Sequence, residues 1–185
     1  MIRTLIKPLF MGVVAVMLAV LPMSAGATPS NSAERGGGAN NSVERGAVTN
    51  LPIPRFVSLK AKSGNARRGP GLTYRIDWVF KHINTPLMVT AEYGHWRRVQ
   101  DKDGQGGWMH YALLSGVRMV IINAPNVALR IKPNPQAAPA AYAEEGAIMR
   151  LGECMLDWCA ISAGGYKGWA MKSDLWGVWA EELRN

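Results

Sequence analysis

The sequence predicts an all-β protein that contains two small, similar β-barrels arranged one after the other. Two observations support this prediction. The last two-thirds of the chain repeats a set of anchoring residues with a fixed period, and short alternating segments separated by turn residues fill both copies. No stretch of the sequence has the apolar spacing of a long amphipathic helix.

The repeat is marked by a tryptophan, a Gly-Trp pair, and a leucine and a glycine that follow it. The first copy has Trp96, Gly107-Trp108, Leu114 and Gly116, and the second has Trp158, Gly168-Trp169, Leu175 and Gly177. The first tryptophan recurs after 62 residues and the other anchors after 61. A fixed period with matched aromatic residues indicates two copies of one folding unit.

The four repeated tryptophans are predicted to form the structural core. A tryptophan near the start of a strand can bury a large area and anchor a small barrel. The alternative is that these side chains form a platform for a ligand. The residues concerned are Trp96, Trp108, Trp158 and Trp169.

Residues 1–27 have the features of a cleaved secretory signal peptide. Arg3 and Lys7 supply a cationic start, residues 9–21 form an apolar run, and Ala25-Gly26-Ala27 matches an Ala-x-Ala cleavage site. An uncleaved anchor is the alternative, but the run is shorter than the about 20 residues of a spanning helix. The sequence therefore predicts a periplasmic protein, cleaved after Ala27, with membrane contact only through the signal peptide before cleavage.

Residues 28–50 are predicted to form a disordered linker. They contain Gly36-Gly37-Gly38 and a short internal repeat, in which residues 31–36 are similar to residues 41–46. Because they offer almost no apolar surface for burial, we expect them to stay flexible. The globular part then consists of residues 51–118 for the first copy and 119–179 for the second, and residues 180–185 form a C-terminal tail.

Each copy contains a predicted three-stranded meander. The strands span residues 87–92, 96–100 and 107–110 in the first copy, and residues 148–154, 158–162 and 167–171 in the second. A single helical turn then leads into a last short strand. An irregular segment rich in proline and glycine precedes each meander and is expected to form a long surface loop.

Positive charge is concentrated in the first copy. Residues 51–118 contain 11 Lys and Arg against 4 Asp and Glu, whereas residues 119–185 contain 6 against 7. A basic face on an exported protein suggests anionic partners, such as cell-wall carboxylates or lipid headgroups. The alternative is that the charge only keeps a small domain soluble.

Cys154 and Cys159 are the two cysteines of the chain, and we predict a disulfide between them. An oxidising compartment makes a disulfide the default. Two cysteines that flank a four-residue turn can also face each other across adjacent strands. A redox-active pair is the alternative, but the spacing is not Cys-x-x-Cys.

The segment before the first meander carries the candidate ligand-binding residues. Arginine side chains can bind carboxylates through their paired N–H groups, and aromatic faces beside them can stack on a ligand. The alternative is a set of solvated arginines beside a partly buried tryptophan. The candidates are Arg67, Arg68, Tyr74, Arg75 and Trp78.

These motifs together resemble the bacterial SH3-like domain. The resemblance rests on residues 65–70 (Asn-x-Arg-x-Gly-Pro), a tyrosine shortly after, Trp96, and Gly107-Trp108 followed six residues later by Leu114. It covers about residues 55–179 and looks like one subfamily of exported, stand-alone SH3-like proteins of Gram-negative bacteria. It implies a small β-barrel for each copy and a binding role in the cell envelope, where members of the superfamily recognise peptidoglycan peptides or other proteins.

The second copy departs from this pattern. It has Lys132-Pro133-Asn134-Pro135 where the first copy has Gly69-Pro70-Gly71. The proline residues stiffen the loop, so equivalent ligand binding is not expected there. Binding is therefore assigned to the first copy and a supporting role to the second.

The sequence does not favour catalysis, a cofactor or a metal site. His82, His95 and His110 are not spaced like metal ligands. Both cysteines belong to a strand hairpin, and no Gly-x-Ser-x-Gly elbow or phosphate-binding glycine loop occurs. Single-strand nucleic-acid binders have a similar basic, aromatic composition, but the export signal argues against nucleic acid as a partner.

These observations predict a non-enzymatic cell-envelope protein whose first SH3-like domain recognises an anionic cell-wall peptide or an envelope protein. Two alternatives remain open. One is a structural or adaptor protein without a small-ligand site, and the other is a regulatory subunit of a cell-wall hydrolase.

Overall fold

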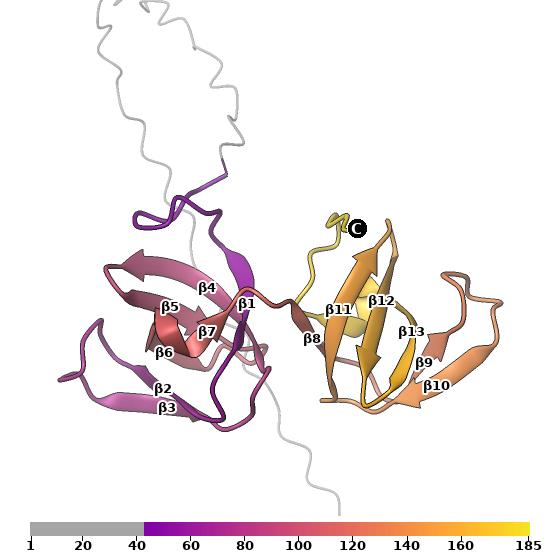
Figure 1. Ribbon diagram of the computed structural model, residues 1–185, viewed down its shortest axis with the longest axis horizontal. Coiled ribbons are helices and arrows are strands. Elements are labelled where there is room, and N and C mark those ends of the chain that lie inside the picture. Colours follow the sequence, from indigo (N-terminus) through magenta and orange to yellow (C-terminus); the bar gives the residue numbers. More distant parts are fainter. Residues whose placement is uncertain (1–42) are drawn as a thin grey trace, which may run out of the picture. The chain divides into compact units, whose positions relative to one another are not determined.

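The computed structural model describes residues 43–185, which form two seven-stranded antiparallel sheets (Figure 1). The predicted signal peptide and residues 28–42 of the predicted linker lie outside the described residues. The first sheet contains β1 (Arg55–Leu59), β2 (Gly64–Arg67), β3 (Ile76–Phe80), β4 (Pro86–Tyr93), β5 (Trp96–Gln100), β6 (Gly106–His110) and β7 (Leu114–Ser115). The second contains β8 (Met119–Ile122), β9 (Val127–Arg130), β10 (Pro139–Ala143), β11 (Ile148–Cys154), β12 (Trp158–Ala163), β13 (Tyr166–Met171) and β14 (Leu175–Trp176).

The two sheets share one strand order. The first runs β3-β2-β6-β5-β4-β1-β7, and adding seven to each number gives the order of the second, β10-β9-β13-β12-β11-β8-β14. The predicted meanders are β4–β6 and β11–β13. The predicted helical turns are the 3-10 helices η1 (Tyr111–Leu113) and η2 (Lys172–Asp174), which lead into β7 and β14. The predicted all-β fold with two tandem copies is confirmed.

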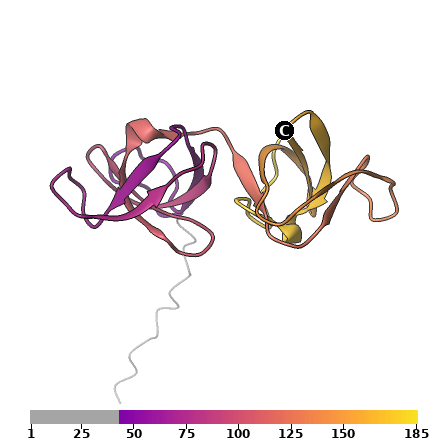
Figure 2. The same cartoon turned by 90° about the horizontal axis from the view of Figure 1, so that it is seen from below.

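The segments predicted as irregular loops each contain a hairpin instead. Glycine, proline and alanine have low strand propensity, so the sequences of β2 and β10 gave no local signal. The first strand of each hairpin forms because it pairs with a distant strand, β2 with β6 and β9 with β13. The prolines and glycines occupy the β2–β3 and β9–β10 connections, which project away from their sheets (Figures 1 and 2).

The Gly-Trp motif lies where β2 runs tightly against β6, and β9 against β13. A Cβ atom on Gly107 would lie 2.5 Å from the carbonyl oxygen of Arg67, and one on Gly168 would lie 2.7 Å from the Cβ of Leu129. Gly107 also has a φ of 149°, which side-chain-bearing residues rarely adopt. Only glycine fits at these contacts, which explains why the motif recurs in both copies.

Each sheet encloses its own core of aliphatic side chains. The first core includes Leu59, Leu87, Val89, Val99 and Met109. The second includes Ile122, Leu129, Leu151, Cys159 and Ile161.

The prediction that the four repeated tryptophans form this core is wrong. Trp96, Trp108, Trp158 and Trp169 are half-buried, and none belongs to either core cluster. The reason is strand phase, since successive side chains point to opposite faces. Val99 and Ile161 point inward, so Trp96 and Trp158, three positions before them, lie on the outer face with Trp108 and Trp169.

Residues 43–52 pack against the first sheet, so the prediction of a disordered linker is wrong for residues 43–50. Arg45 forms a β-bridge with Pro52. The N–H of Gly46 donates to the carbonyl of Leu51 at 2.8 Å, and the N–H of Asn50 donates to the carbonyl of Gly46 at 2.9 Å. The composition argument failed because polar contacts, rather than buried apolar area, order this turn.

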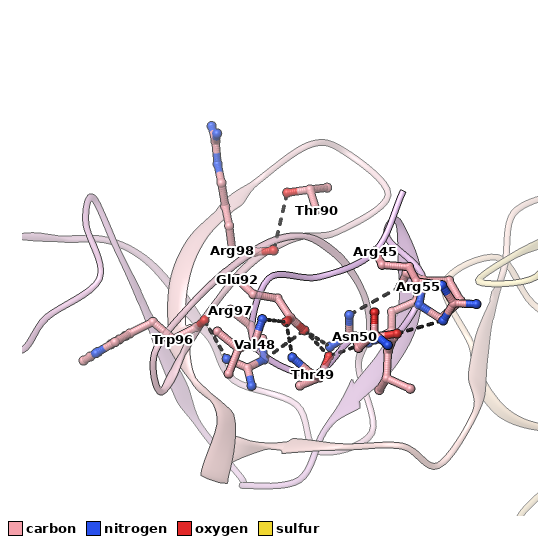
Figure 3. A network of polar contacts seen from close by, with 12 residues as sticks. Arg45, Val48, Thr49, Asn50, Arg55, Thr90, Glu92, Trp96, Arg97 and Arg98 are labelled. Carbon is pink, nitrogen blue, oxygen red and sulfur yellow. Dashed lines mark hydrogen bonds and ion pairs between the residues drawn. The ribbon is translucent and has the colours of Figure 1, made fainter. Parts of the chain in front are cut away.

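Glu92, near the end of β4, connects this turn to the first sheet (Figure 3). Its carboxylate is fully buried and accepts hydrogen bonds from the N–H groups of Val48 (3.0 Å) and Thr49 (2.8 Å) and from Thr49 Oγ1 (2.7 Å). It also pairs with Arg55 at 2.6 Å and with Arg97 at 3.4 Å. A buried carboxylate is tolerated only with such a complete set of partners.

The second sheet has a disulfide where the first has the Glu92–Arg97 ion pair. Glu92 and Arg97 are cross-strand partners between β4 and β5, and Cys154 and Cys159 are cross-strand partners between β11 and β12. The structure contains the predicted Cys154–Cys159 disulfide. The backbone of Cys154 also exchanges hydrogen bonds of 2.7 and 3.0 Å with Arg184, which fixes the C-terminal tail beside the disulfide.

We expect Gly107→Ala to lower the free energy of unfolding by roughly 1–3 kcal/mol, because the new Cβ meets backbone atoms that cannot rotate away. The matched control is Gly116→Ala, whose Cβ would meet open space, and which should change stability by less than about 0.5 kcal/mol. Urea denaturation followed by tryptophan fluorescence measures both. Equal stability of the two variants would contradict the tight β2–β6 contact.

The Glu92 network predicts a loss of stability in acid. Burial raises the pKa of Glu92, but hydrogen bonds from Thr49, Arg55 and Val48 outweigh it and lower the pKa from 4.5 to about 2. Because the pKa is lower in the folded state, the carboxylate stabilises the fold above pH 4.5, and this contribution disappears as the pH falls towards 2. The shift corresponds to at most about 3 kcal/mol.

Thermal unfolding of wild type and Glu92→Gln over this pH range tests that expectation. The variant should be less stable at pH 7, and the difference should shrink between about pH 5 and pH 2. Glu145→Gln, in an exposed turn, is the control. A wild-type–Glu92→Gln difference that does not change with pH would contradict the role assigned to Glu92.

The disulfide is expected to leave no thiol available for labelling in denatured, unreduced protein and two after reduction. Closing a loop this short should stabilise the second sheet by about 2 kcal/mol, so the Cys154→Ser/Cys159→Ser variant should lose that amount. Two labelled thiols before reduction would show that the bond does not form.

Candidate functional site

Arg67 closes the loop between β2 and β3. Its Nη1 donates to the carbonyl oxygen of Tyr74 at 2.7 Å. Arg130 makes the matching contact in the second sheet, where its Nη1 donates to the carbonyl oxygen of Ala137 at 2.6 Å. Each arginine is the cross-strand partner of the second tryptophan of its repeat. Because the same contact occurs in both repeats, we assign Arg67 the structural role of closing the β2–β3 loop.

Arg68 and Arg75 converge on Asp77. Their Nε atoms lie 3.2 and 2.7 Å from the two carboxylate oxygens. The hydrogen bond from Arg75, opposed by partial burial and assisted by Arg68, lowers the pKa of Asp77 below its usual value. Both arginine side chains are more than 60% exposed, at 63% and 67%. Such pairs add little stability, but they orient two guanidinium groups that retain free N–H groups for a carboxylate.

Tyr74 and Trp78 lie on the same hairpin and are the chain neighbours of Arg75 and Asp77. The ring of Tyr74 covers Gly69, where a Cβ would lie 2.5 Å from it. Trp78 is 40% exposed and packs edge-on to Phe80, with ring centroids 6.4 Å apart. It lines a hollow of about 580 Å³ along β3, which Asp77 also lines. The five candidates therefore share one hairpin but not one pocket, and their role in ligand binding stays a prediction.

A polar depression, here called the basic hollow, lies between the β2–β3 hairpin and the meander. It has a volume of about 400 Å³. Arg98, which the sequence analysis did not single out, is exposed and is the cross-strand partner of Trp108. Its lining includes Arg67, Arg68, Asp77, Arg98 and Trp108.

A second depression, here called the aromatic hollow, shares Arg67 with the basic hollow. It has a volume of about 290 Å³ and is lined by Ser63, Asn65, Arg67, Leu72, Trp96, His110 and Leu113. Leu72 is 76% exposed. Because Arg67 lines both hollows, they are adjacent on the surface of the first sheet.

Aromatic side chains continue beyond the aromatic hollow. Trp96 meets His110 edge-on at 5.6 Å, and His110 lies 4.9 Å from the ring of Tyr111. His95 lies 5.6 Å from the same tyrosine. The sequence analysis found that these histidines are not spaced like metal ligands and assigned them no other role. Strand phase could have found the cluster, since Trp96 and His110 are cross-strand partners on the face opposite Val99 and Met109.

The described residues provide neither a metal centre nor a membrane-spanning helix. Within residues 43–185, no three His, Cys, Asp or Glu side chains are grouped closely enough to bind a metal ion. No helix in the same range is both long and apolar enough to cross a bilayer.

Two solved structures, of NlpC2 and NlpC1 from Trichomonas vaginalis, show a distant similarity. Each is 12% identical to this chain with a TM-score of 0.32, and the similarity covers 68% and 71% of this chain. It covers 49% and 48% of those proteins, so this chain spans about half of their length. At this level the similarity carries no argument about function. A comparison with curated proteins finds no match.

The family comparison matches each repeat separately. The bacterial SH3 domain family (SH3_4) matches residues 60–116 and residues 123–177. The first match contains β2–β7 and the second β9–β14. Since the two matches cover more than half of the chain and coincide with the two sheets, this chain belongs to the bacterial SH3 domain family.

Proposed function

We propose that this chain is a non-enzymatic, periplasmic binding protein that recognises an anionic cell-wall peptide, or a similar segment of an envelope protein, through its first SH3 domain. The observation that carries the proposal is the adjacency of the basic and aromatic hollows at Arg67. Export is part of the proposal and rests on the sequence of residues 1–27.

The basic hollow supplies groups that suit a carboxylate. Arg68 and Arg98 are exposed at its rim, and a guanidinium can donate two parallel N–H groups to one carboxylate. Asp77 neutralises part of the charge of Arg68, so Arg98 is the stronger attraction. The net charge of +7 on residues 51–118 raises the local concentration of anionic ligands.

The aromatic hollow supplies an apolar surface next to that charge. Trp96 and His110 form one wall and Leu72 is exposed beside them. Hollows of about 290 and 400 Å³ are at the lower end of the size range of ligand pockets, so we assign each of them one part of a small ligand. The arrangement therefore suits a short peptide in which a free carboxylate lies next to an apolar side chain, as in the cell-wall peptides recognised by other bacterial SH3 domains.

Co-sedimentation with purified peptidoglycan at about 0.15 M salt, where exposed charges are screened, tests the proposal. We expect wild type to sediment, and both Trp96→Ala and the Arg68→Ala/Arg98→Ala double variant to lose at least about fivefold in affinity, about 1 kcal/mol. Arg67→Ala is avoided because Arg67 closes its own loop.

The control variant Lys132→Ala/Arg184→Ala removes two exposed charges from the second repeat and should sediment like wild type. Equal sedimentation of all four proteins would show that the two hollows do not form the site. If wild type itself remains in solution, the cell-wall ligand is wrong. A periplasmic pull-down with wild type and Trp96→Ala then decides between an envelope-protein segment and an adaptor role that needs neither hollow.

A further inference from the structure

A groove larger than either hollow of the first repeat lies in the second repeat, to which the sequence analysis assigned no binding. It has a volume of about 760 Å³ and lies on the outer face of β11, β12 and β13. Its floor consists of small residues, and aromatic and cationic side chains surround that floor. The lining residues used below are Arg150, Gly152, Ala160, Ser162, Tyr166, Lys167 and Trp169.

Strand register arranges these side chains in two rows. In the first row, Arg150 on β11 is the partner of Ser162 on β12, which is the partner of Lys167 on β13. In the second row, Ala160 on β12 is the partner of Trp169 on β13. The first row is polar and cationic, and the second places a methyl group beside an indole ring.

The first repeat shows why the groove is open only in the second. The basic hollow occupies the matching place, with Arg98 and Trp108 as cross-strand partners where the second repeat has Ala160 and Trp169. Replacing a guanidinium side chain by a methyl group removes the atoms that fill the first site. The volume is correspondingly about 760 Å³ instead of about 400 Å³.

The cationic row fits one anionic group. Arg150 and Lys167 are exposed, and neither forms an ion pair with any residue in the range 43–185. They flank Ser162 on the two neighbouring strands, so their Cα atoms are about 10 Å apart at ordinary strand spacing. Both long side chains can therefore reach a single carboxylate or phosphate above the Ser162 hydroxyl.

The second row fits a flat ring rather than an extended peptide. β12 lies between two antiparallel ladders, which occupy most of its backbone N–H and C=O groups. An extended peptide therefore finds no free strand edge on this face to pair with. A sugar ring needs no such edge, because its C–H face can stack on Trp169 while its hydroxyls stay hydrated. Tyr166, which is 67% exposed, borders the same floor.

We propose that the second repeat binds an acidic sugar, a single pyranose ring with one carboxylate or phosphate, through Trp169, Ala160 and the Arg150–Ser162–Lys167 row. This site is separate from the hollows of the first repeat. The two repeats then recognise different chemical groups, a short acidic peptide in the first and a charged sugar in the second.

Titration of the isotope-labelled chain, followed by amide and indole NMR signals, tests this site with defined probes. Glucuronic acid and glucose 6-phosphate should shift the signals of Trp169 and Lys167 saturably, with dissociation constants of about 0.1–10 mM. Uncharged glucose should bind at least about fivefold more weakly. The two acidic probes distinguish a carboxylate from a phosphate source.

Two variants locate the site. Ala160→Gln puts a long, uncharged side chain where the first repeat carries Arg98, so the fold should tolerate it, and it should weaken acid-sugar binding at least about tenfold by filling the floor beside Trp169. Arg184→Ala removes an exposed charge that does not line the groove, so it is the control and should bind these sugars like wild type. Arg150→Ala/Lys167→Ala should reduce the preference for glucuronic acid over glucose to below about twofold.

Several outcomes would overturn the proposal. One is the absence of saturable shifts up to about 50 mM sugar. Another is unchanged binding in a folded Ala160→Gln variant. A third is an alanyl-glutamate dipeptide that shifts the same signals at lower concentration than glucuronic acid, which would make the groove a peptide site. Failure of the first-repeat proposal leaves these results unaffected, because none of them depends on Trp96 or Arg68.

Discussion

The tight approach of β2 to β6, and of β9 to β13, determines where the hollows of the first repeat and the groove of the second can form. A glycine at the contact lets one backbone lie directly against the other, which places an arginine beside the tryptophan that follows the glycine. That arginine then closes its loop by donating to a carbonyl seven residues on. The hollows of the first repeat lie next to Arg67, and the groove of the second lies next to Arg130. One backbone contact therefore underlies the surfaces of both repeats.

The fold was predictable because its signals are local. Alternation and turn residues indicated the meanders, and the period indicated two copies. The β2–β3 and β9–β10 hairpins were missed because their strands depend on pairing with a distant strand, which Gly64–Arg67 does not show by itself. The linker prediction failed over residues 43–50 for a similar reason, since Glu92, more than 40 residues away, supplies the partners.

The candidate site was predicted less well than the fold. The sequence indicated the arginine-rich hairpin. The four tryptophans, however, were assigned to the core because their side chains are large, and the direction in which each points from its strand was not considered. Trp96 was placed in the core, although Val99 in the same strand already defines the inward face. No feature of the sequence indicated the groove of the second repeat. It results from the exchange of Arg98 for Ala160 at matching positions, which is visible only once the two sheets are aligned strand by strand.

The hairpin that carries Glu92 and Arg97 in one repeat and Cys154 and Cys159 in the other holds a segment that flanks its sheet. Residues 48 and 49 bind to Glu92, and Arg184 pairs with the backbone of Cys154. The Glu92 contacts depend on pH, because the carboxylate can be protonated, whereas the disulfide depends on the redox potential of the solution. Protonation of Glu92 therefore weakens its contacts with residues 48 and 49 without affecting the Cys154–Cys159 bond, and reduction breaks that bond without affecting the Glu92 contacts. The two copies of one fold in this chain therefore hold their flanking segments with groups of different chemistry.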